Sequence, residues 1–257
     1  MRDMDFSQDD LGESRAREFQ SRYEITAPVL DLPAIASRVF HADVAFMKMP
    51  AVADAVTKRD PETEVVLIAI ATSDNPERQR FSLAHEIGHL VFGHLHTPEK
   101  DDASELQAHA FARHLLLPRH ELEAFFTGGG NDGGGLRMLS NIVEHFRVSG
   151  QVAAIQLRRF GYIGESLASE WSSAEASSLA LRYGWADARD IRVKESLTSL
   201  PPARMLANAT DAYLLHQLPL EAVAVVEGAP VEQLRRRFEA EGIVPPVTGG
   251  ELSLDDL

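Results

Sequence analysis

The sequence predicts an α+β fold in which a small β-sheet is followed by a series of helices. Two short segments, Ala42–Met47 and Glu64–Thr72, are apolar or alternating and rich enough in β-branched residues to be strands. Downstream, apolar residues recur at helical spacing over 76–92 and 102–117. The 257 residues are 44% apolar, which is normal for a globular core and allows one large or two modest domains.

The segments before these helices are assigned in order along the chain. Residues 1–19 are polar and predict a frayed or loosely held helix. A helix near 31–40 leads into the first strand. A polar turn at Lys58–Glu64, which contains Pro61, separates the two predicted strands.

The helix over 76–92 has clear start and stop signals. Asn75 is a good N-cap, Pro76 suits the first helical position, and Gly93 is a typical stop. Between them the helix is apolar around most of its circumference. A helix of this kind is buried in the core.

This buried helix contains the motif His-Glu-x-x-His, formed by His85, Glu86 and His89. Residues four apart lie on the same helix face, roughly 6 Å apart along the axis, so both imidazoles can reach one metal ion. Glu86 falls beside that pair, where its carboxylate could take a proton from the attacking water. Polar groups in a buried helix are costly unless they are paired or bind metal. The motif therefore predicts a metal site and a catalytic base.

Two histidines leave a catalytic zinc one protein ligand short. Glu105 is the best candidate for the third, because it lies at the end of an apolar stripe on the helix over 102–117. The alternative is that Glu105 forms a capping box with Asp102. His94 and His96 are rival ligands, but their spacing does not match the metzincin pattern, so we expect both to be solvated beyond the helix end.

The extended pattern resembles the ImmA/IrrE-type metallopeptidase family. The resemblance rests on the run from Glu77 to His89, followed by Glu105-x-x-Ala108-x-x-Phe111-Ala112-x-x-Leu115-Leu116-x-Pro118. The segment Ala27–Ala36 also resembles the entry helix of that family. The similarity covers roughly residues 20–162. It implies a zincin-like domain with His85, His89 and Glu105 as zinc ligands and Glu86 as the catalytic carboxylate.

The chain departs from the family pattern at two positions. His109 stands where the family usually has Asn or Asp, and Gln107 stands where it is often acidic. His109 could orient a ligand imidazole. His109, His114 and His120 are also the candidates to stabilise the oxyanion, although a structural role is the simpler expectation for each.

Downstream of residue 126 the chain is expected to be helical. Thr127–Gly135 is rich in glycine and predicts a flexible loop or linker. We divide the chain into a zincin-like domain (1–126), a helix-turn-helix-like pair (136–162) and a helical C-terminal domain (163–257). A second helix-turn-helix candidate spans Leu220–Phe238, and helical pairs of this kind can also serve simply for packing or dimerisation.

A formal net charge of −14 argues against direct DNA binding and favours a basic protein partner. The compact basic spots are Arg158–Arg159 and Arg235–Arg237. The absence of cysteine excludes disulfides and thiolate zinc sites. The longest apolar run, Val65–Ala71, is too short to span a membrane and the first residues show no signal pattern, so we expect a cytoplasmic protein.

These features predict a zinc metallo-endopeptidase with one Zn²⁺ per chain. The family resemblance implies that its substrate is a helix-turn-helix repressor in a stress-response or mobile-element circuit. The alternative is a non-proteolytic zinc-binding regulator that binds a repressor or DNA. Glu86 favours the enzyme, because it is not a ligand and has no evident structural task. The choice between zinc and manganese, the activation trigger and the oligomeric state are left open, with a dimer through the C-terminal helices as one option.

Overall fold

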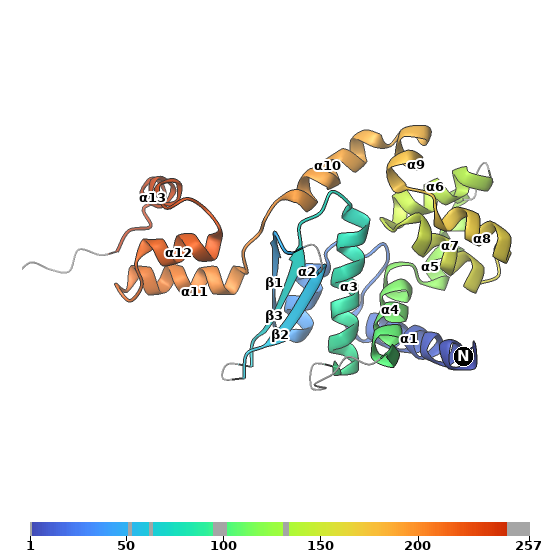
Figure 1. The fold of residues 1–257 in the computed structure, drawn as a ribbon, viewed down its shortest axis with the longest axis horizontal. Coiled ribbons are helices and arrows are strands. Elements are labelled where there is room, and N and C mark those ends of the chain that lie inside the picture. The colour runs from blue at the N-terminus through green and yellow to red at the C-terminus, as the bar shows by residue number, and fades with distance from the viewer. Residues whose placement is uncertain (1, 51–52, 62–63, 95–101, 131–133, 246–257) are drawn as a thin grey trace, which may run out of the picture. The chain divides into compact units, whose positions relative to one another are not determined.

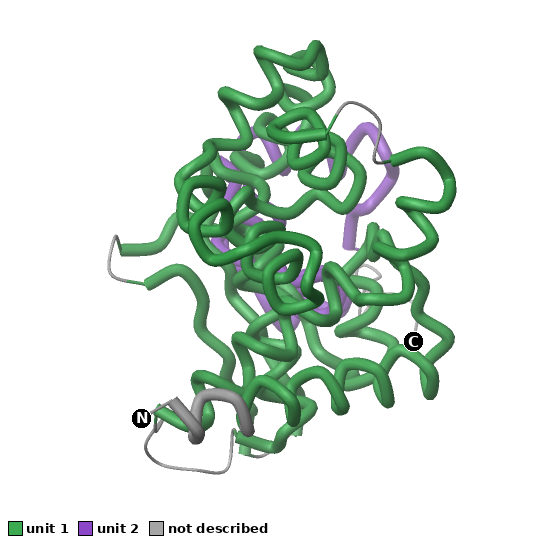
Figure 2. Tube along the Cα trace, turned by 90° about the vertical axis from the view of Figure 1, so that its right-hand side faces the viewer, with its two compact units in different colours: residues 1–198 green, residues 199–257 purple. Residues whose placement is uncertain are grey.

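The computed structural model describes residues 2–50, 53–61, 64–94, 102–130 and 134–245 (Figure 1). The chain forms two compact units, residues 1–198 and 199–257 (Figure 2). The helices from residue 126 to Thr198 therefore pack with the region that carries the His-Glu-x-x-His motif. The three-part domain division made from the sequence stays a prediction, whereas the packing places one boundary after Thr198.

Unit 1 contains a three-stranded sheet of β1 (Ala42–Met47), β2 (Ala55–Arg59) and β3 (Val66–Ala71) in the order β1-β3-β2. The central strand β3 runs parallel to β1 and antiparallel to β2, and its Ile68 lies opposite both Val44 and Thr57. Together with the surrounding helices this confirms the α+β prediction. The strand β2 was not expected, because its outer half falls in the segment that the sequence marks as a polar turn.

The helix α3 (Pro76–Phe92) begins and ends where its signals predict. The Asn75 side chain accepts a hydrogen bond from the backbone N–H of Arg78 at 2.9 Å, and Gly93 ends the helix with a left-handed φ of 75°. The helix contacts β2 and β3 on one side and α4 (Asp102–Leu116) on the other (Figure 1).

Small residues let α3 and α4 approach closely. A Cβ at Gly88 would lie only 3.1 Å from both the Ala108 Cα and the Phe111 ring, so no larger residue fits there without a shift. A glycine also allows the close contact between α4 and α1 (Arg2–Tyr23), because a Cβ on Gly12 would collide with Ala110. The two helices α1 and α3 thus pack at short distances on α4.

The expectation of a loose helix over residues 1–19 is wrong, because α1 is docked against α4. Its Ala16 and Phe19 are buried, and its Asp9 forms ion pairs with Arg113 and Arg159. Burial raises the pKa of Asp9, but the hydrogen bond with His114 and the charge of Arg113 more than offset this and hold the pKa well below its ordinary range. The polar residues that suggested fraying are therefore the ones that fasten the helix.

The remaining elements of unit 1 are helical. They are α2 (Leu32–Phe40), α5 (Arg119–Phe125), a wide helical turn at Phe126–Gly130, α6 (Gly135–Phe146), α7 (Gly150–Arg159), α8 (Glu165–Ser172), α9 (Ala176–Tyr183) and α10 (Ala186–Leu197).

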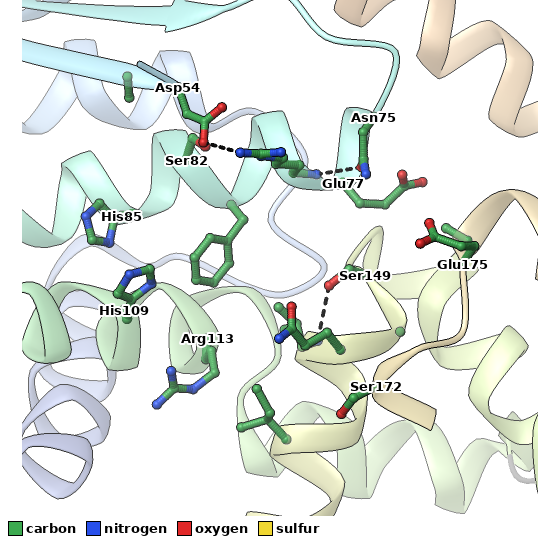
Figure 3. Close-up of a pocket in the computed structure, with 18 of the residues that line it drawn as sticks. Asp54, Asn75, Glu77, Ser82, His85, His109, Arg113, Ser149, Ser172 and Glu175 are labelled. Atoms are coloured by element: carbon green, nitrogen blue, oxygen red, sulfur yellow. Dashed lines mark hydrogen bonds and ion pairs between the residues drawn. The ribbon is translucent and has the colours of Figure 1, made fainter. Parts of the chain in front are cut away.

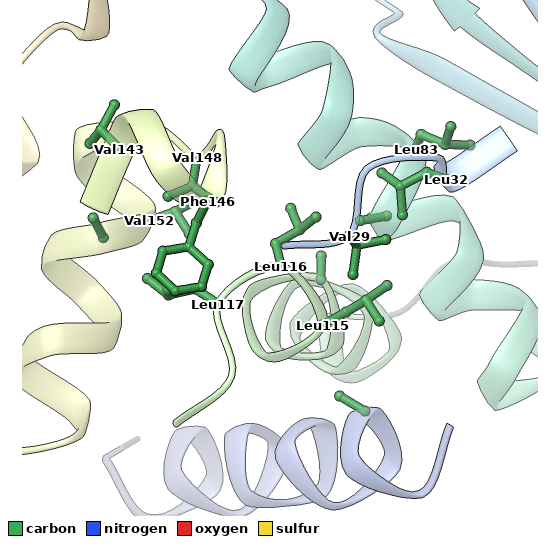
Figure 4. Close-up of a cluster of buried hydrophobic side chains, with 14 of the residues drawn as sticks. Val29, Leu32, Leu83, Leu115, Leu116, Leu117, Val143, Phe146, Val148 and Val152 are labelled. Atoms are coloured by element: carbon green, nitrogen blue, oxygen red, sulfur yellow. The ribbon is translucent and has the colours of Figure 1, made fainter. Parts of the chain in front are cut away.

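One hydrophobic core runs through the whole of this unit. Leu115, Leu116 and Leu117 at the end of α4 lie between Val29 and Leu32 on one side and Phe146 and its neighbours in α6 and α7 on the other (Figure 4). The core therefore crosses the predicted boundary at residue 126 without interruption.

Unit 2 consists of α11 (Ala203–Leu214), α12 (Leu220–Glu227) and α13 (Val231–Ala240). It has a small core of its own, made of Ala209, Leu220, Val223, Ala224, Leu234 and Phe238. Among the residues that the structure describes, no helix is long and apolar enough to cross a membrane.

Arginines of both basic spots noted in the sequence pair with nearby carboxylates. Arg158 pairs with Glu165, and Arg159 pairs with acidic residues of α1. In unit 2, Arg235 lies 3.6 Å from Glu232, and Arg237 pairs with Glu227. Arginines that already have carboxylate partners are less available to phosphate groups.

Candidate metal and catalytic site

Three side chains that the sequence singles out converge between α3 and α4. The Nε2 atoms of His85 and His89 lie 3.0 Å apart. The Glu105 carboxylate lies 3.2 Å from His85 Nε2 and 3.4 Å from His89 Nε2. The sequence prediction that these three residues share one place is therefore matched by the geometry, although their role as ligands stays a prediction.

Two local features bring these atoms together. The four-residue spacing puts both imidazoles on one face of α3. The close contact of Gly88 with Ala108 then brings α4 near enough for Glu105, one turn earlier on α4, to reach them. A side chain larger than hydrogen at position 88 would push the two ligand-bearing helices apart.

The donor set fits a zinc ion. Ligands bound at about 2.0–2.2 Å in a tetrahedron are separated from each other by about 3.3–3.6 Å. The three separations of 3.0, 3.2 and 3.4 Å are at or slightly below this spacing, so a small outward shift of the side chains would accommodate the ion. Two imidazole nitrogens and one carboxylate are also the donors of a common catalytic zinc site, in which a fourth position stays open.

Glu86 lies beside this group and is only 3% exposed. The hydroxyl of Thr57 donates a hydrogen bond to Glu86 Oε2 at 2.6 Å. Because Thr57 belongs to β2, the edge strand positions the carboxylate from the side opposite α4. Sequence analysis missed Thr57, since nothing in the local pattern marks a residue 29 positions away from Glu86 as its partner.

His109 is the one member of the three oxyanion candidates that lines the cleft among the described residues (Figure 3). Its ring lies 4.4 Å from that of His85 and stacks against Phe81 at 5.6 Å. Burial lowers the pKa of His109 below its ordinary value, with Arg113 acting in the same direction and Glu105 against it. The imidazole is therefore neutral at pH 7 and can donate one hydrogen bond.

His109 also offers a donor atom within 4.8 Å of donors on His85 and Glu105, which makes it a rival metal ligand. The donor atoms of His85, His89 and Glu105 lie closer together, at most 3.4 Å apart. These distances are nearer to the ligand–ligand separation around a tetrahedral ion. We therefore favour His89 as the ligand and place His109 next to the site.

The two other oxyanion candidates, His114 and His120, do not line the cleft. His114 is buried against Gln156 and Asp9, and the side chain of His120 is 65% exposed on α5. The expectation that His94 is solvated is wrong, because its ring nitrogens lie 2.9 Å from His89 Nδ1 and 3.0 Å from Gln107 Oε1. His96 lies outside the described residues.

A cleft of about 760 Å³ leads away from His85 and Glu86. Its walls come from the start of β2, the outer face of α3, His109 and Arg113 of α4, and the facing ends of α7 and α8 (Figure 3). Gly150 at the start of α7 allows the close approach of the Ala174 carbonyl that shapes the far wall. A cleft of this size can hold several residues of an extended peptide.

Comparison with known proteins agrees with this geometry. Residues 40–158 match the family model described as the IrrE N-terminal-like domain. The chain is also similar to the radiation response metalloprotease IrrE of Deinococcus radiodurans, with 28% identity over 202 residues. That alignment covers 77% of this chain and 54% of the relative, so the chain spans about half the length of the curated protein it matches. The matched family supports a zincin-like fold for the region that holds α3, α4 and the sheet.

Proposed function

We propose that this chain, a member of the ImmA/IrrE family of metallopeptidases, is a zinc-dependent endopeptidase that hydrolyses a protein substrate. The observation that carries the proposal is the convergence of His85, His89 and Glu105 within 3.4 Å, with a buried Glu86 beside them. A structural zinc site would need a fourth protein ligand and would have no use for an adjacent carboxylate.

Three residues of the chain have distinct roles in peptide hydrolysis, beside the proposed metal ligands. Zinc, when bound, would polarise the scissile carbonyl and make the attacking water more acidic. Glu86 takes the proton of that water and delivers it to the leaving amine. Thr57 holds the Glu86 carboxylate in position through its hydrogen bond to Oε2. His109 is placed to donate a hydrogen bond to the carbonyl oxygen as negative charge develops there.

The substrate is recognised as an extended segment. The edge strand β2 can pair with a peptide through its backbone, and the cleft beyond it can take the side chains.

A net charge of −14 favours a basic partner, and a DNA-binding repressor of the helix-turn-helix type has this character. We place this reaction in the cytoplasm, in a stress-response or mobile-element circuit. The paired arginines of α7 and α13 support an action on the repressor and not on DNA.

The metal is tested by elemental analysis of the purified chain, with one zinc per chain expected. Glu105→Ala should lower the zinc affinity by at least ~10²-fold, because it removes the one anionic ligand. Asp102→Ala, on the same turn of α4 but exposed, is the matched control and should keep its zinc. A chain that neither contains nor takes up a stoichiometric transition metal would refute the proposal.

The reaction is tested with Glu86→Gln and a purified repressor encoded beside the gene for this chain. Cleavage should fall by at least ~10²-fold, whereas zinc content and the melting temperature should stay near the wild-type values. Glu121→Gln, which changes a carboxylate on α5 that accepts from Ala27 N, is the control. The non-proteolytic regulator makes the opposite prediction, since Glu86→Gln would then relieve repression as fully as the wild type.

A further inference from the structure

A line of hydrogen bonds leads from the metal site to the N-terminal helix. His89 Nδ1 lies 2.9 Å from His94 Nδ1, and His94 Nε2 lies 3.0 Å from Gln107 Oε1. The Gln107 amide then donates to Gln8 Oε1 at 2.6 Å. The line thus joins the end of α3, the first turns of α4 and α1.

Once the direction of the last hydrogen bond is known, the donor and the acceptor of each other bond along the line follow from it. Because Gln107 donates its Nε2–H to Gln8, its carbonyl oxygen faces His94 and accepts a proton from His94 Nε2. A neutral His94 then has its lone pair on Nδ1 and accepts from His89 Nδ1–H. A neutral His89 consequently has its lone pair on Nε2, the atom that faces His85 and Glu105.

We propose that His94 and Gln107 are positioning residues, which fix the tautomer and ring orientation of His89 so that its Nε2 is ready to bind the metal. The inference rests on the proposed function, since it assigns a task to residues around the same site. A ligand imidazole in metalloproteins commonly donates its other N–H to an acceptor, and loss of that acceptor weakens metal binding. Here the acceptor is a second histidine, whose own orientation depends on Gln107 and, through Gln107, on Gln8.

The docking of α1 gives this line a fixed end. Gln8 is followed directly by Asp9, which pairs with Arg113 of α4 and Arg159 of α7. The next turn of α1 presses Gly12 against Ala110 of α4. The N-terminal helix, which the sequence predicts to be loosely held, therefore contributes to the geometry of the site. Gln8 acts through Gln107, which lies 99 residues further along the chain.

The test compares zinc affinity in the full chain and two variants. His94→Phe keeps a ring to stack on Phe92, 5.3 Å away, but removes both nitrogens. Gln107→Leu keeps the volume of the side chain but removes the acceptor. Competition with a chelator should give a dissociation constant for zinc at least about 10-fold higher in each variant. The visible spectrum of the cobalt-substituted protein should change as well, because the orientation of the His89 ring is no longer fixed.

Gln156→Leu is the matched control. Gln156 is a buried amide on α7 that contacts a histidine outside the site, His114, at 3.2 Å. Its loss should lower the melting temperature and leave the zinc affinity and the cobalt spectrum unchanged. Gln107→Glu keeps an acceptor for His94 and should keep zinc affinity close to that of the wild type.

The two proposals fail in different ways. If wild-type protein binds no zinc, the proposed function is wrong. If wild-type protein binds zinc but His94→Phe and Gln107→Leu bind it within about twofold of the wild type, the positioning role is overturned and the proposed function stands. An equal loss of zinc affinity in Gln156→Leu would also overturn it, because the effect would then follow general stability.

Discussion

Glu77 and Glu86 lie on the same helix, α3, and are almost equally buried, at 2% and 3% exposed, but their partners differ. Glu77 lies 3.1 Å from the guanidinium of Arg189. Glu86 accepts a hydrogen bond from the neutral hydroxyl of Thr57 and has two imidazoles beside it. Burial alone therefore does not identify a catalytic carboxylate. Glu77 belongs to an ion pair that joins α3 to α10, whereas Glu86 is positioned by a strand of the sheet next to the histidines.

The N-terminal end of α3, where Glu77 lies, is an anchor for the C-terminal part of unit 1. Besides the Glu77–Arg189 pair, the Gln79 amide donates to Ser196 O at 2.9 Å, and the Ser196 hydroxyl donates to Ser73 O at 2.7 Å. These bonds tie α10 to the start of α3. The C-terminal half of the helix carries the imidazoles instead. Variants at the two ends should therefore change different properties.

The largest stability effect is expected for Glu77→Gln. Removing one partner of a buried ion pair leaves the Arg189 charge uncompensated, which typically costs about 3–5 kcal/mol. The free energy of unfolding, measured by denaturant titration, should fall by an amount of this order, and the zinc content of the folded fraction should not change. A variant that folds as stably as the wild type but has lost its zinc would show that Glu77 belongs to the site.

A smaller effect, confined to catalysis, is expected for Thr57→Val. Valine matches threonine in shape but cannot hold the Glu86 carboxylate, so the rate constant for substrate cleavage should fall by about 10-fold. Zinc stoichiometry and the unfolding free energy should remain close to the wild-type values. Thr57→Ser restores the hydroxyl and should recover most of the rate. If valine and serine behave alike, the hydrogen bond to Glu86 has no catalytic role.

The two ends of α3 also differ in what the sequence reveals about them. Asn75, Gly93 and the His85–His89 spacing are local signals, which depend only on helix geometry, and all of them predict the observed helix. Glu105 could be found because the helix that carries it has a regular apolar stripe. Thr57 and Gln8 could not, since their partners lie 29 and 99 residues away and only the packed fold brings them together. The docked α1 was hidden for a related reason, because its Asp9 is satisfied by ion pairs with distant parts of the chain. The strand β2 was hidden because Lys58 and Arg59 belong to the segment that reads as a polar turn.

The smallest effect is expected for Asn75→Ala at the start of α3. The Asn75 side chain caps the helix by accepting from Arg78 N, and loss of such a cap typically costs about 1 kcal/mol. For a unit of this size, that corresponds to a decrease in melting temperature of about 2–4 °C. Asn75→Asp keeps the cap and is the control. Because the ion pair of Glu77 with Arg189 still holds this end of the helix, the frayed turn should not displace His85, three turns further on, and zinc affinity should be unchanged. A zinc affinity that falls in step with the melting temperature would mean that the two ends of α3 are coupled, and that the anchor formed with α10 is part of the metal site.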